Sequence, residues 1–149
     1  MSSGLDELEK EFWAEMRKIY TEKTIDHALN PRNVGSISDA DGFGKVTGSC
    51  GDTMEIWLKI KDDKITQATF WTDGCGTTTA CGSIVTEMVK GKSPIEALRI
   101  GSEEILESLG GLPEESIHCS VLAAETLREA IRNYLTIKKE PWKKAYQRR

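Results

Sequence analysis

The sequence predicts an α+β fold that contains one antiparallel β-hairpin. Apolar and polar residues alternate over residues 53–60, which is the period of a half-buried strand. A second β-rich run covers residues 65–73, and the short polar turn of residues 61–64 joins the two runs. Strands joined by so short a turn pair in antiparallel fashion. Apolar residues recur at helical spacing on both sides of this hairpin, which adds the helical part of the fold.

Length and composition restrict the classes of function. The 149 residues suffice for one domain with a core, and a net charge of −4 with a pI near 5.3 disfavours nucleic-acid binding. No apolar run is long enough to cross a bilayer. Residues 1–7 lack the basic and apolar regions of a secretory signal, so we expect a cytoplasmic protein with no membrane partner. In that reducing setting the four cysteines stay thiols or bind metal.

Residues 5–20 have the apolar stripe and acidic opposite face of an amphipathic helix. Such a helix ordinarily lies on the surface and covers the core. Phe12 and Trp13 are also large enough to anchor a partner protein, so a docking role stays open.

The segment between this helix and the hairpin has little regular pattern. A short helical piece over residues 24–28 ends at the strong break of Asn30-Pro31. Residues 38–44 are rich in Asp, Ser and Gly and are expected to form an exposed loop. Residues 45–47 have a strand-like pattern that is too short to decide whether they form a strand.

Four helices are expected after the hairpin, and the chain then ends in a basic tail. Ser and Pro residues mark the starts of these helices, and Gly residues mark their ends. The tail is expected to be solvated or to steer a partner toward an otherwise acidic protein. The helices are predicted over residues 77–90, 94–99, 102–110 and 118–137.

Three cysteines lie among glycine or polar neighbours, which is unusual for buried apolar thiols. Cys50 precedes the hairpin and Cys75 follows it, so antiparallel pairing brings the two thiols to the same end of the hairpin. Cys75 and Cys119 both lie at predicted helix starts, where backbone N–H groups and the helix dipole favour a thiolate. We therefore expect a lowered pKa at both.

These three thiols, with Asp52 or His118 as a fourth donor, have the composition of a site for zinc or an iron–sulfur cluster. The spacing lacks the paired Cys-x-x-Cys loops of zinc ribbons and does not separate the two. A carboxylate is a hard oxygen donor, whereas such a centre prefers soft sulfur donors, so Asp52 is expected to weaken the binding of a cluster. Cys81 is expected to pack in the interior, although a role as spare ligand or redox partner of Cys75 stays open. His27 is expected to be structural.

Taken together, these motifs resemble the iron–sulfur cluster assembly scaffolds of the IscU/NifU N-terminal family. The likeness runs from about Tyr20 to Tyr134, in the order and spacing of the family. The segments that carry it are Asp26-His27, residues 30–35 (Asn-Pro-Arg-Asn-Val-Gly), Cys50-Gly51-Asp52, Gly74-Cys75-Gly76, Thr86-Glu87, residues 90–92 (Lys-Gly-Lys) and His118-Cys119-Ser120.

The resemblance implies a SufE/NifU-like α+β fold, in which helices pack on one face of a small three-stranded antiparallel sheet. It also divides the chain into three parts. These are an N-terminal helical extension (residues 1–19), a scaffold domain (residues 20–137) and a basic C-terminal tail (residues 138–149).

The resemblance further implies a set of site residues. Cys50, Cys75 and Cys119 would be the thiolate ligands of a [2Fe-2S] cluster. Asp52 and His118 would lie at the same site, and one of them would complete the ligand shell or assist release. Cys119 matches the position usually assigned as persulfide acceptor. Such scaffolds can carry zinc in place of iron and the cluster.

The implied function is assembly without turnover chemistry, so the protein is not expected to be an enzyme. Sulfur would come from a cysteine desulfurase and electrons from a ferredoxin-like donor, and the cluster would pass to apo iron–sulfur client proteins. A homodimer that shares an exposed cluster stays open. Many bacterial members have Leu-Pro-Pro-Val-Lys before His-Cys, where a dedicated Hsp70-type chaperone binds. Here the segment is Leu112-Pro113-Glu114-Glu115-Ser116, which does not favour that route of release.

Two other hypotheses assign the protein to a different class of function. The first is a sulfur-transfer protein whose zinc site accepts persulfide without building a cluster. The second is a purely structural zinc module. Uptake of iron and sulfide with a visible chromophore separates the scaffold from both.

Overall fold

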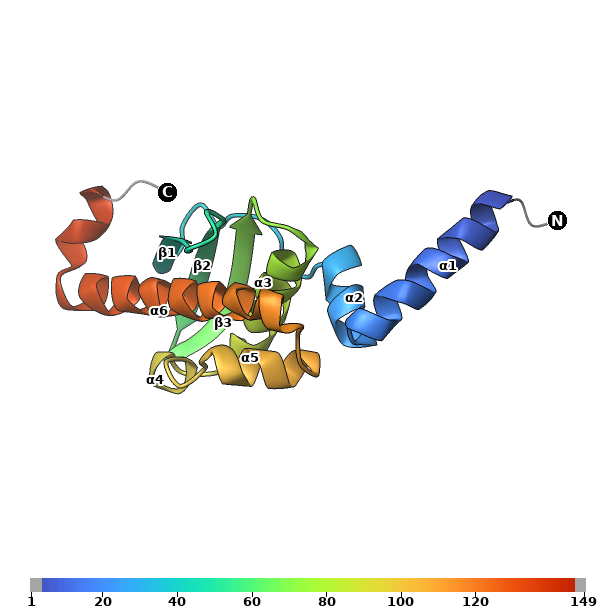
Figure 1. The fold of residues 1–149 in the computed structure, drawn as a ribbon. Helices are drawn as coiled ribbons and strands as arrows, with labels where there is room; N and C mark the ends of the chain where they lie inside the picture. The colour runs from blue at the N-terminus through green and yellow to red at the C-terminus, as the bar shows by residue number, and fades with distance from the viewer. Residues whose placement is uncertain (1–3, 147–149) are drawn as a thin grey trace.

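The computed structural model describes residues 4–146, which form a three-stranded sheet with helices along it (Figure 1). The strands are β1 (Gly42–Thr47), β2 (Thr53–Lys61) and β3 (Lys64–Thr72). The α-helices are α1 (Gly4–Ile19), α2 (Glu22–Leu29), α3 (Gly76–Val89), α4 (Pro94–Ala97), α5 (Ser102–Leu109) and α6 (Ile117–Lys139), and two 3₁₀ segments cover Glu114–Ser116 and Pro141–Tyr146.

The sheet is an antiparallel meander in the order β1-β2-β3. The predicted hairpin is confirmed as β2 and β3, whose pairing places Met54 opposite Thr72. The edge of β3 away from β2 is partly covered, because Phe70 exchanges backbone hydrogen bonds with Asn33 and Gly35. This pairing fixes the ends of all three strands relative to one another, and hence the segments that follow them.

The prediction that residues 38–44 form an exposed loop is wrong for residues 42–44, which belong to β1. The glycines that suggested a loop are needed for packing. A Cβ atom at Gly42 would lie 2.6 Å from the Ala130 carbonyl oxygen, and one at Gly44 would lie 2.5 Å from the Thr126 carbonyl oxygen. Helix α6 therefore crosses β1 at a distance that only glycine allows.

Helices α3, α5 and α6 lie on one face of the sheet, as predicted (Figure 1), and the core fills the space between them and the sheet. Figure 1 shows α6 running across the sheet, with α3 and α5 beside it. The alternating residues of β2 that were predicted to face inward are buried, or partly buried in the case of Ile60. Trp57 was expected on the opposite, polar face, yet it is only 5% exposed. The Phe43 ring lies 5.3 Å from the Trp57 ring and covers it.

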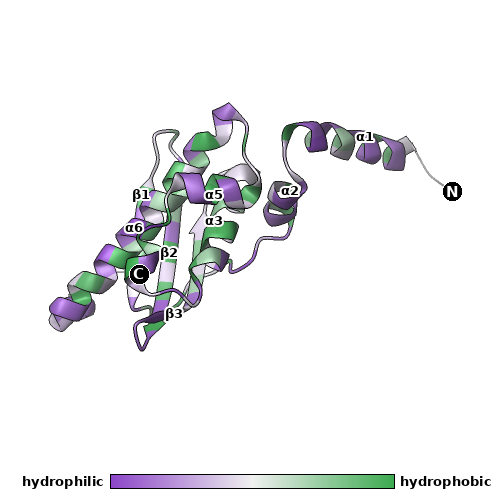
Figure 2. Cartoon of the chain, turned by 90° about the horizontal axis from the view of Figure 1, so that it is seen from below, coloured by the Kyte–Doolittle hydropathy of each residue, from purple (hydrophilic) through white to green (hydrophobic). Residues whose placement is uncertain are grey.

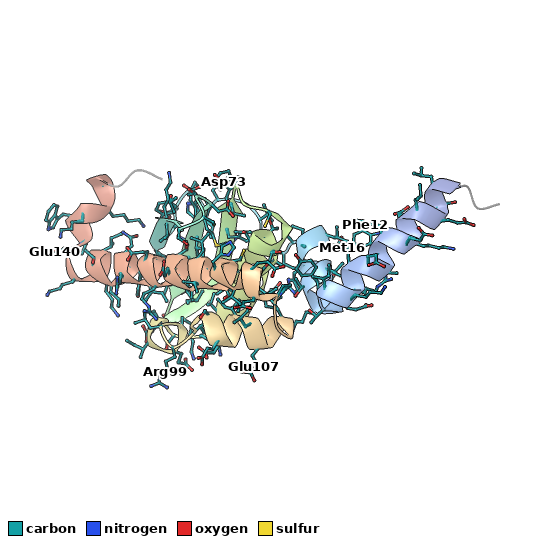
Figure 3. All side chains as sticks on the ribbon, in the orientation of Figure 1. Phe12, Met16, Asp73, Arg99, Glu107 and Glu140 are labelled. Carbon is teal, nitrogen blue, oxygen red and sulfur yellow. The ribbon has the colours of Figure 1, made fainter. Side chains whose placement is uncertain are left out.

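Helix α1 does not cover the core. None of its residues is buried, and it extends away from the sheet beyond α2 (Figure 1). Figure 2 shows that hydrophilic and hydrophobic residues alternate along it, as expected of an amphipathic helix. Phe12, 54% exposed, and Met16 lie along α1 at a distance from the sheet in Figure 3. The docking role suggested for this helix therefore stays a prediction.

The predicted basic tail begins inside a helix. Lys138 and Lys139 still belong to α6, and Lys144 forms an ion pair of 3.3 Å with Asp39. Residues 147–149 of that tail, and residues 1–3 of the predicted extension, lie outside the described residues. Within residues 4–146, no helix has both the length and the apolar character needed to span a membrane.

Candidate functional site

The loop between β1 and β2 carries Cys50 and Asp52. Its shape is set by two backbone hydrogen bonds, from Gly48 N–H to the Asp52 carbonyl (2.8 Å) and from Gly51 N–H to the Gly48 carbonyl (3.0 Å). Gly51 has a φ of +92°, a conformation that favours glycine. The loop presents Cys50 to solvent.

The turn between β3 and α3 carries Cys75. Thr53 N–H donates to the Asp73 carboxylate at 2.8 Å, and Gly74 N–H donates to the Thr72 hydroxyl at 3.1 Å. Asp73 lies at this end of the sheet in Figure 3. The turn is thus tied to the start of β2, directly after Asp52. This confirms that the hairpin brings the two cysteine-bearing segments to the same end.

The third segment is the start of α6. The 3₁₀ turn of Glu114–Ser116 leads into the helix, and its first turn contains His118 and Cys119. His118 is exposed, whereas Cys119 is only 1% exposed. The His118 Nε2 lies 3.6 Å from the Cys119 sulfur.

One hydroxyl group links these three segments. Thr78 is fully buried, and its Oγ1 lies 3.2 Å from Asp52 Oδ2, 3.3 Å from the Cys119 Sγ and 3.7 Å from the Cys75 Sγ. The structure therefore brings Asp52, Cys75 and Cys119 around a common neighbour. Sequence analysis did not identify Thr78. Its position three residues after Cys75 on a predicted helix places both on one face, which is the pattern that could have revealed it.

Gly74 leaves room for this threonine. A Cβ atom at Gly74 would lie 2.7–2.8 Å from Cβ, Cγ2 and Oγ1 of Thr78, closer than real Cβ contacts. A Cβ at Gly76 would meet only Ala28, at an ordinary 3.6 Å. The two glycines around Cys75 therefore differ: only Gly74 is required by the packing of the site.

Cys50 and His118 meet at a neighbouring hollow. Both line a surface pocket of about 340 Å³ between the loop and the start of α6. All five predicted site residues thus gather at one end of the sheet. Within residues 4–146, however, the structure has no group of three or more His, Cys, Asp or Glu side chains placed to hold a metal ion.

The predicted low pKa of Cys75 is confirmed. Burial acts to raise the pKa of this thiol, but hydrogen bonds from the backbone and hydroxyl of Thr78 and from the backbone of Thr77 lower it below its ordinary value on balance. These donors belong to the first turn of α3, for which Cys75 is the N-cap residue. Cys75 is also exposed, so it combines thiolate character with access to solvent.

The predicted low pKa of Cys119 is wrong for this structure. Burial raises the pKa of the Cys119 thiol to about 11, and the hydrogen bond from Thr78 only partly opposes it. The nearby Cys75, Cys50 and Asp52 contribute to this rise, because negative charges disfavour a second thiolate. Desolvation outweighs the helix N-terminus here.

Cys81 and His27 have the structural roles predicted for them. Cys81 is fully buried within the core cluster, and burial raises its pKa strongly, so the thiol stays protonated. His27 is buried and its Nδ1 lies 2.6 Å from the Ser83 hydroxyl.

An apolar groove of about 420 Å³ reaches the site from the side of α1 and α2. It is lined by Phe12, Trp13 and Met16 at one end and by Cys75 and Thr77 at the other. The groove therefore links apolar side chains of α1 with the exposed thiol of Cys75.

Comparison with known proteins identifies a family that covers most of the chain. The family described as "NifU-like N terminal domain" matches residues 19–141. The iron–sulfur cluster assembly scaffold protein IscU 1 of Archaeoglobus fulgidus is 50% identical over 117 residues, which is 78% of this chain and 76% of that protein. IscU of Escherichia coli K12, also named a scaffold protein, is 48% identical over 120 residues, 77% of this chain and 93% of that protein.

Solved structures show the same fold. The N-terminal NifU-like protein of Brucella abortus superposes with a TM-score of 0.63 at 21% identity, over 81% of this chain and 97% of that one. A scaffold protein for the SUF system from Fervidobacterium islandicum superposes with a TM-score of 0.62 at 24% identity, over 76% and 97%. At these identities the likeness shows the α+β fold.

Proposed function

The chain belongs to the family of the NifU-like N-terminal domain, and we propose that it is a scaffold that assembles an iron–sulfur cluster and then releases it. The observation that carries this proposal is the meeting of Asp52, Cys75 and Cys119 around the Thr78 hydroxyl, with Cys50 and His118 beside them. Three thiols are the soft donors that iron–sulfur clusters require. The cluster is the cargo of such a protein, and since the described residues have no group of three such donors placed to hold a metal ion, the donors would close around the cluster as it is assembled.

We propose Cys50, Cys75 and Cys119 as the ligands of a [2Fe-2S] cluster, with Asp52 or His118 completing the shell. Two of the thiols are exposed at turns that other molecules can reach. The Asp52 carboxylate is a hard donor beside soft ones, which makes a bound cluster easier to release. Zinc, which also accepts thiolates, is a substitute that the same donors would bind.

Cys119 is the proposed sulfur acceptor, as the resemblance implies. Its thiolate would attack the outer sulfur of a donor persulfide, so that a new S–S bond forms while the donor cysteine leaves as a thiolate. Reduction of that sulfur to sulfide needs two electrons, which a ferredoxin-like partner would supply. Because Cys119 is buried, it must become exposed before it reacts. Exposed Cys75 is the alternative acceptor.

The proposed partners follow from these steps: a cysteine desulfurase, the electron donor and apo-protein clients, all in a reducing cytoplasm. The apolar groove that ends at Cys75 offers a path by which a desulfurase could approach. Glu114 and Glu115, exposed just before α6, replace the apolar residues that a dedicated Hsp70-type chaperone would bind, so release by another route is proposed. A homodimer that shares the cluster remains part of the proposal to be tested.

Anaerobic reconstitution with iron and sulfide tests this function. We expect visible absorption and a Mössbauer spectrum of a [2Fe-2S] centre, both lost when the three cysteines are replaced by serine. A chain that takes up only zinc and never develops a chromophore would contradict the scaffold and favour zinc-bound sulfur transfer. Incubation with a cysteine desulfurase then identifies the residue that accepts sulfur. The Cys119→Ser variant should carry no persulfide. Persulfide at the wild-type level in this variant would assign the role to Cys75 or Cys50.

A further inference from the structure

We propose that Thr78 is a positioning residue of this site. Its hydroxyl holds Asp52 and the Cys119 sulfur in place in the cluster-free chain, and it donates a hydrogen bond to a thiolate sulfur when a cluster is bound. The first part concerns the chain alone. The second part rests on the proposed function.

The contacts of Thr78 join segments that are far apart in the sequence. Its Oγ1 lies 3.2 Å from the Asp52 carboxylate, in the β1–β2 loop, and 3.3 Å from the Cys119 sulfur, at the start of α6. Thr78 itself belongs to α3, which Cys75 caps. Buried hydroxyl groups require partners, and the three groups within reach of this one belong to the proposed site residues Asp52, Cys75 and Cys119. The hydroxyl therefore fixes the spacing between the loop, α3 and α6.

The chemistry of a hydroxyl suits this role. It has one proton to donate and two lone pairs that accept, so it can bond to a carboxylate, a thiol or a thiolate. A sulfur that carries iron has no proton and can only accept. Hydrogen bonds to cluster sulfurs are among the features that set a cluster's reduction potential. A hydroxyl 3.3 Å from one thiol and 3.7 Å from another is placed to make such a bond.

The absence of a side chain at Gly74 is an independent observation. The Thr78 side chain fills the space where a Cβ of Gly74 would lie, with three of its atoms within 2.8 Å of that position. Thr78 is fully buried and β-branched, so few rotamers are open to it and none carries the hydroxyl into solvent. The turn before α3 thus fixes the direction of the hydroxyl as well as its position.

The test compares Thr78→Val, which removes the hydroxyl and keeps the shape, with Thr78→Ser, which keeps the hydroxyl. Thr79→Val is the matched control, because the structure gives the Thr79 side chain no hydrogen bond to a site residue within the part of the chain it describes. The first readout is the rate of backbone hydrogen–deuterium exchange in the peptides that cover residues 48–53 and 117–124 of the reduced, cluster-free chain, followed by peptide mass. We expect Thr78→Val to raise this rate about fivefold, the change that corresponds to one hydrogen bond of about 1 kcal/mol. Thr78→Ser and Thr79→Val should stay within about twofold of wild type.

The second readout is the reduction potential of the reconstituted cluster. Loss of a donor to sulfur should shift the potential to a more negative value in Thr78→Val, and Thr78→Ser should restore it. An unchanged exchange rate in these two peptides overturns the first part of the proposal, and an unchanged potential overturns the second. If wild-type protein forms no cluster, the proposed function fails, while the exchange rates still decide the first part. Should Thr78→Val not fold, as judged by circular dichroism, Thr78→Ala supplies the same comparison.

Discussion

Replacing Gly74 with alanine should disturb the site through Thr78 and not through the backbone. Gly74 does not have a positive φ, so alanine meets no conformational penalty there. The added Cβ would lie 2.7 Å from the Thr78 Cβ and 2.8 Å from its Cγ2 and Oγ1. Ordinary contacts between carbon atoms are about 3.5–4.0 Å, so the two groups must separate by about 1 Å.

The cost of that crowding follows from the burial of Thr78. Overpacking a close-packed interior typically costs about 1–3 kcal/mol, and a fully buried β-branched side chain cannot swing into solvent. A shift of this size also takes the hydroxyl out of hydrogen-bond range of Asp52 and Cys119, now at 3.2 and 3.3 Å. We therefore expect the free energy of unfolding of Gly74→Ala to fall by about 1–3 kcal/mol.

Gly76→Ala is the matched control, measured with Gly74→Ala by urea unfolding followed by circular dichroism. Its Cβ would make only an ordinary contact of 3.6 Å with Ala28. Both changes restrict the unfolded chain in the same way, so that contribution cancels in the comparison. We expect Gly76→Ala to remain within about 0.5 kcal/mol of wild type. Equal stability of the two variants would refute the packing role given to Gly74.

Three further predictions follow from burial and charge. At pH 7.5 iodoacetamide should modify Cys75 more than about tenfold faster than Cys119 in the cluster-free chain. The reason is that the pKa of Cys75 is lowered, whereas that of Cys119 is raised to about 11. Equal rates at the two thiols would contradict this prediction. Burial lowers the pKa of His27 below 6.5, so its contribution to stability is complete above pH 6.5 and is lost as the pH falls below that value. The urea midpoint of the wild type should therefore fall with pH in this range more steeply than that of His27→Gln. An equally steep fall in the two proteins would argue against this role of His27. Asp52→Ala should lengthen the lifetime of a bound cluster against a chelator, followed by absorbance, and faster decay would exclude a role of the carboxylate in release.

Much of the fold could be predicted from local patterns. The alternation in residues 53–60 is strong enough to define β2 and, with β3, the end of the hairpin where the site lies. Strand β1 was underestimated because Gly42 and Gly44 have low strand propensity. Their presence reflects the approach of the α6 backbone, a tertiary contact that no local pattern records.

The proximity of the candidate site residues could be predicted, but not all of their properties. Hairpin geometry placed Cys50 and Cys75 together, and the helix start correctly indicated a lowered pKa for Cys75. The same argument failed for Cys119 because burial, which depends on the packing of the whole chain, outweighs the helix N-terminus. Thr78 was missed since a threonine in a helix has no distinctive sequence pattern, and its role depends on neighbours from two other segments.

The iron and acid-labile sulfide content of protein purified without oxygen tests the central claim most directly. A cluster scaffold should contain iron and sulfide in equal amounts, as a [2Fe-2S] centre requires, and should lose both when Cys50, Cys75 and Cys119 are replaced by serine. Zinc without sulfide, lost in the same triple variant, would contradict cluster assembly and show that these thiols hold a zinc ion instead.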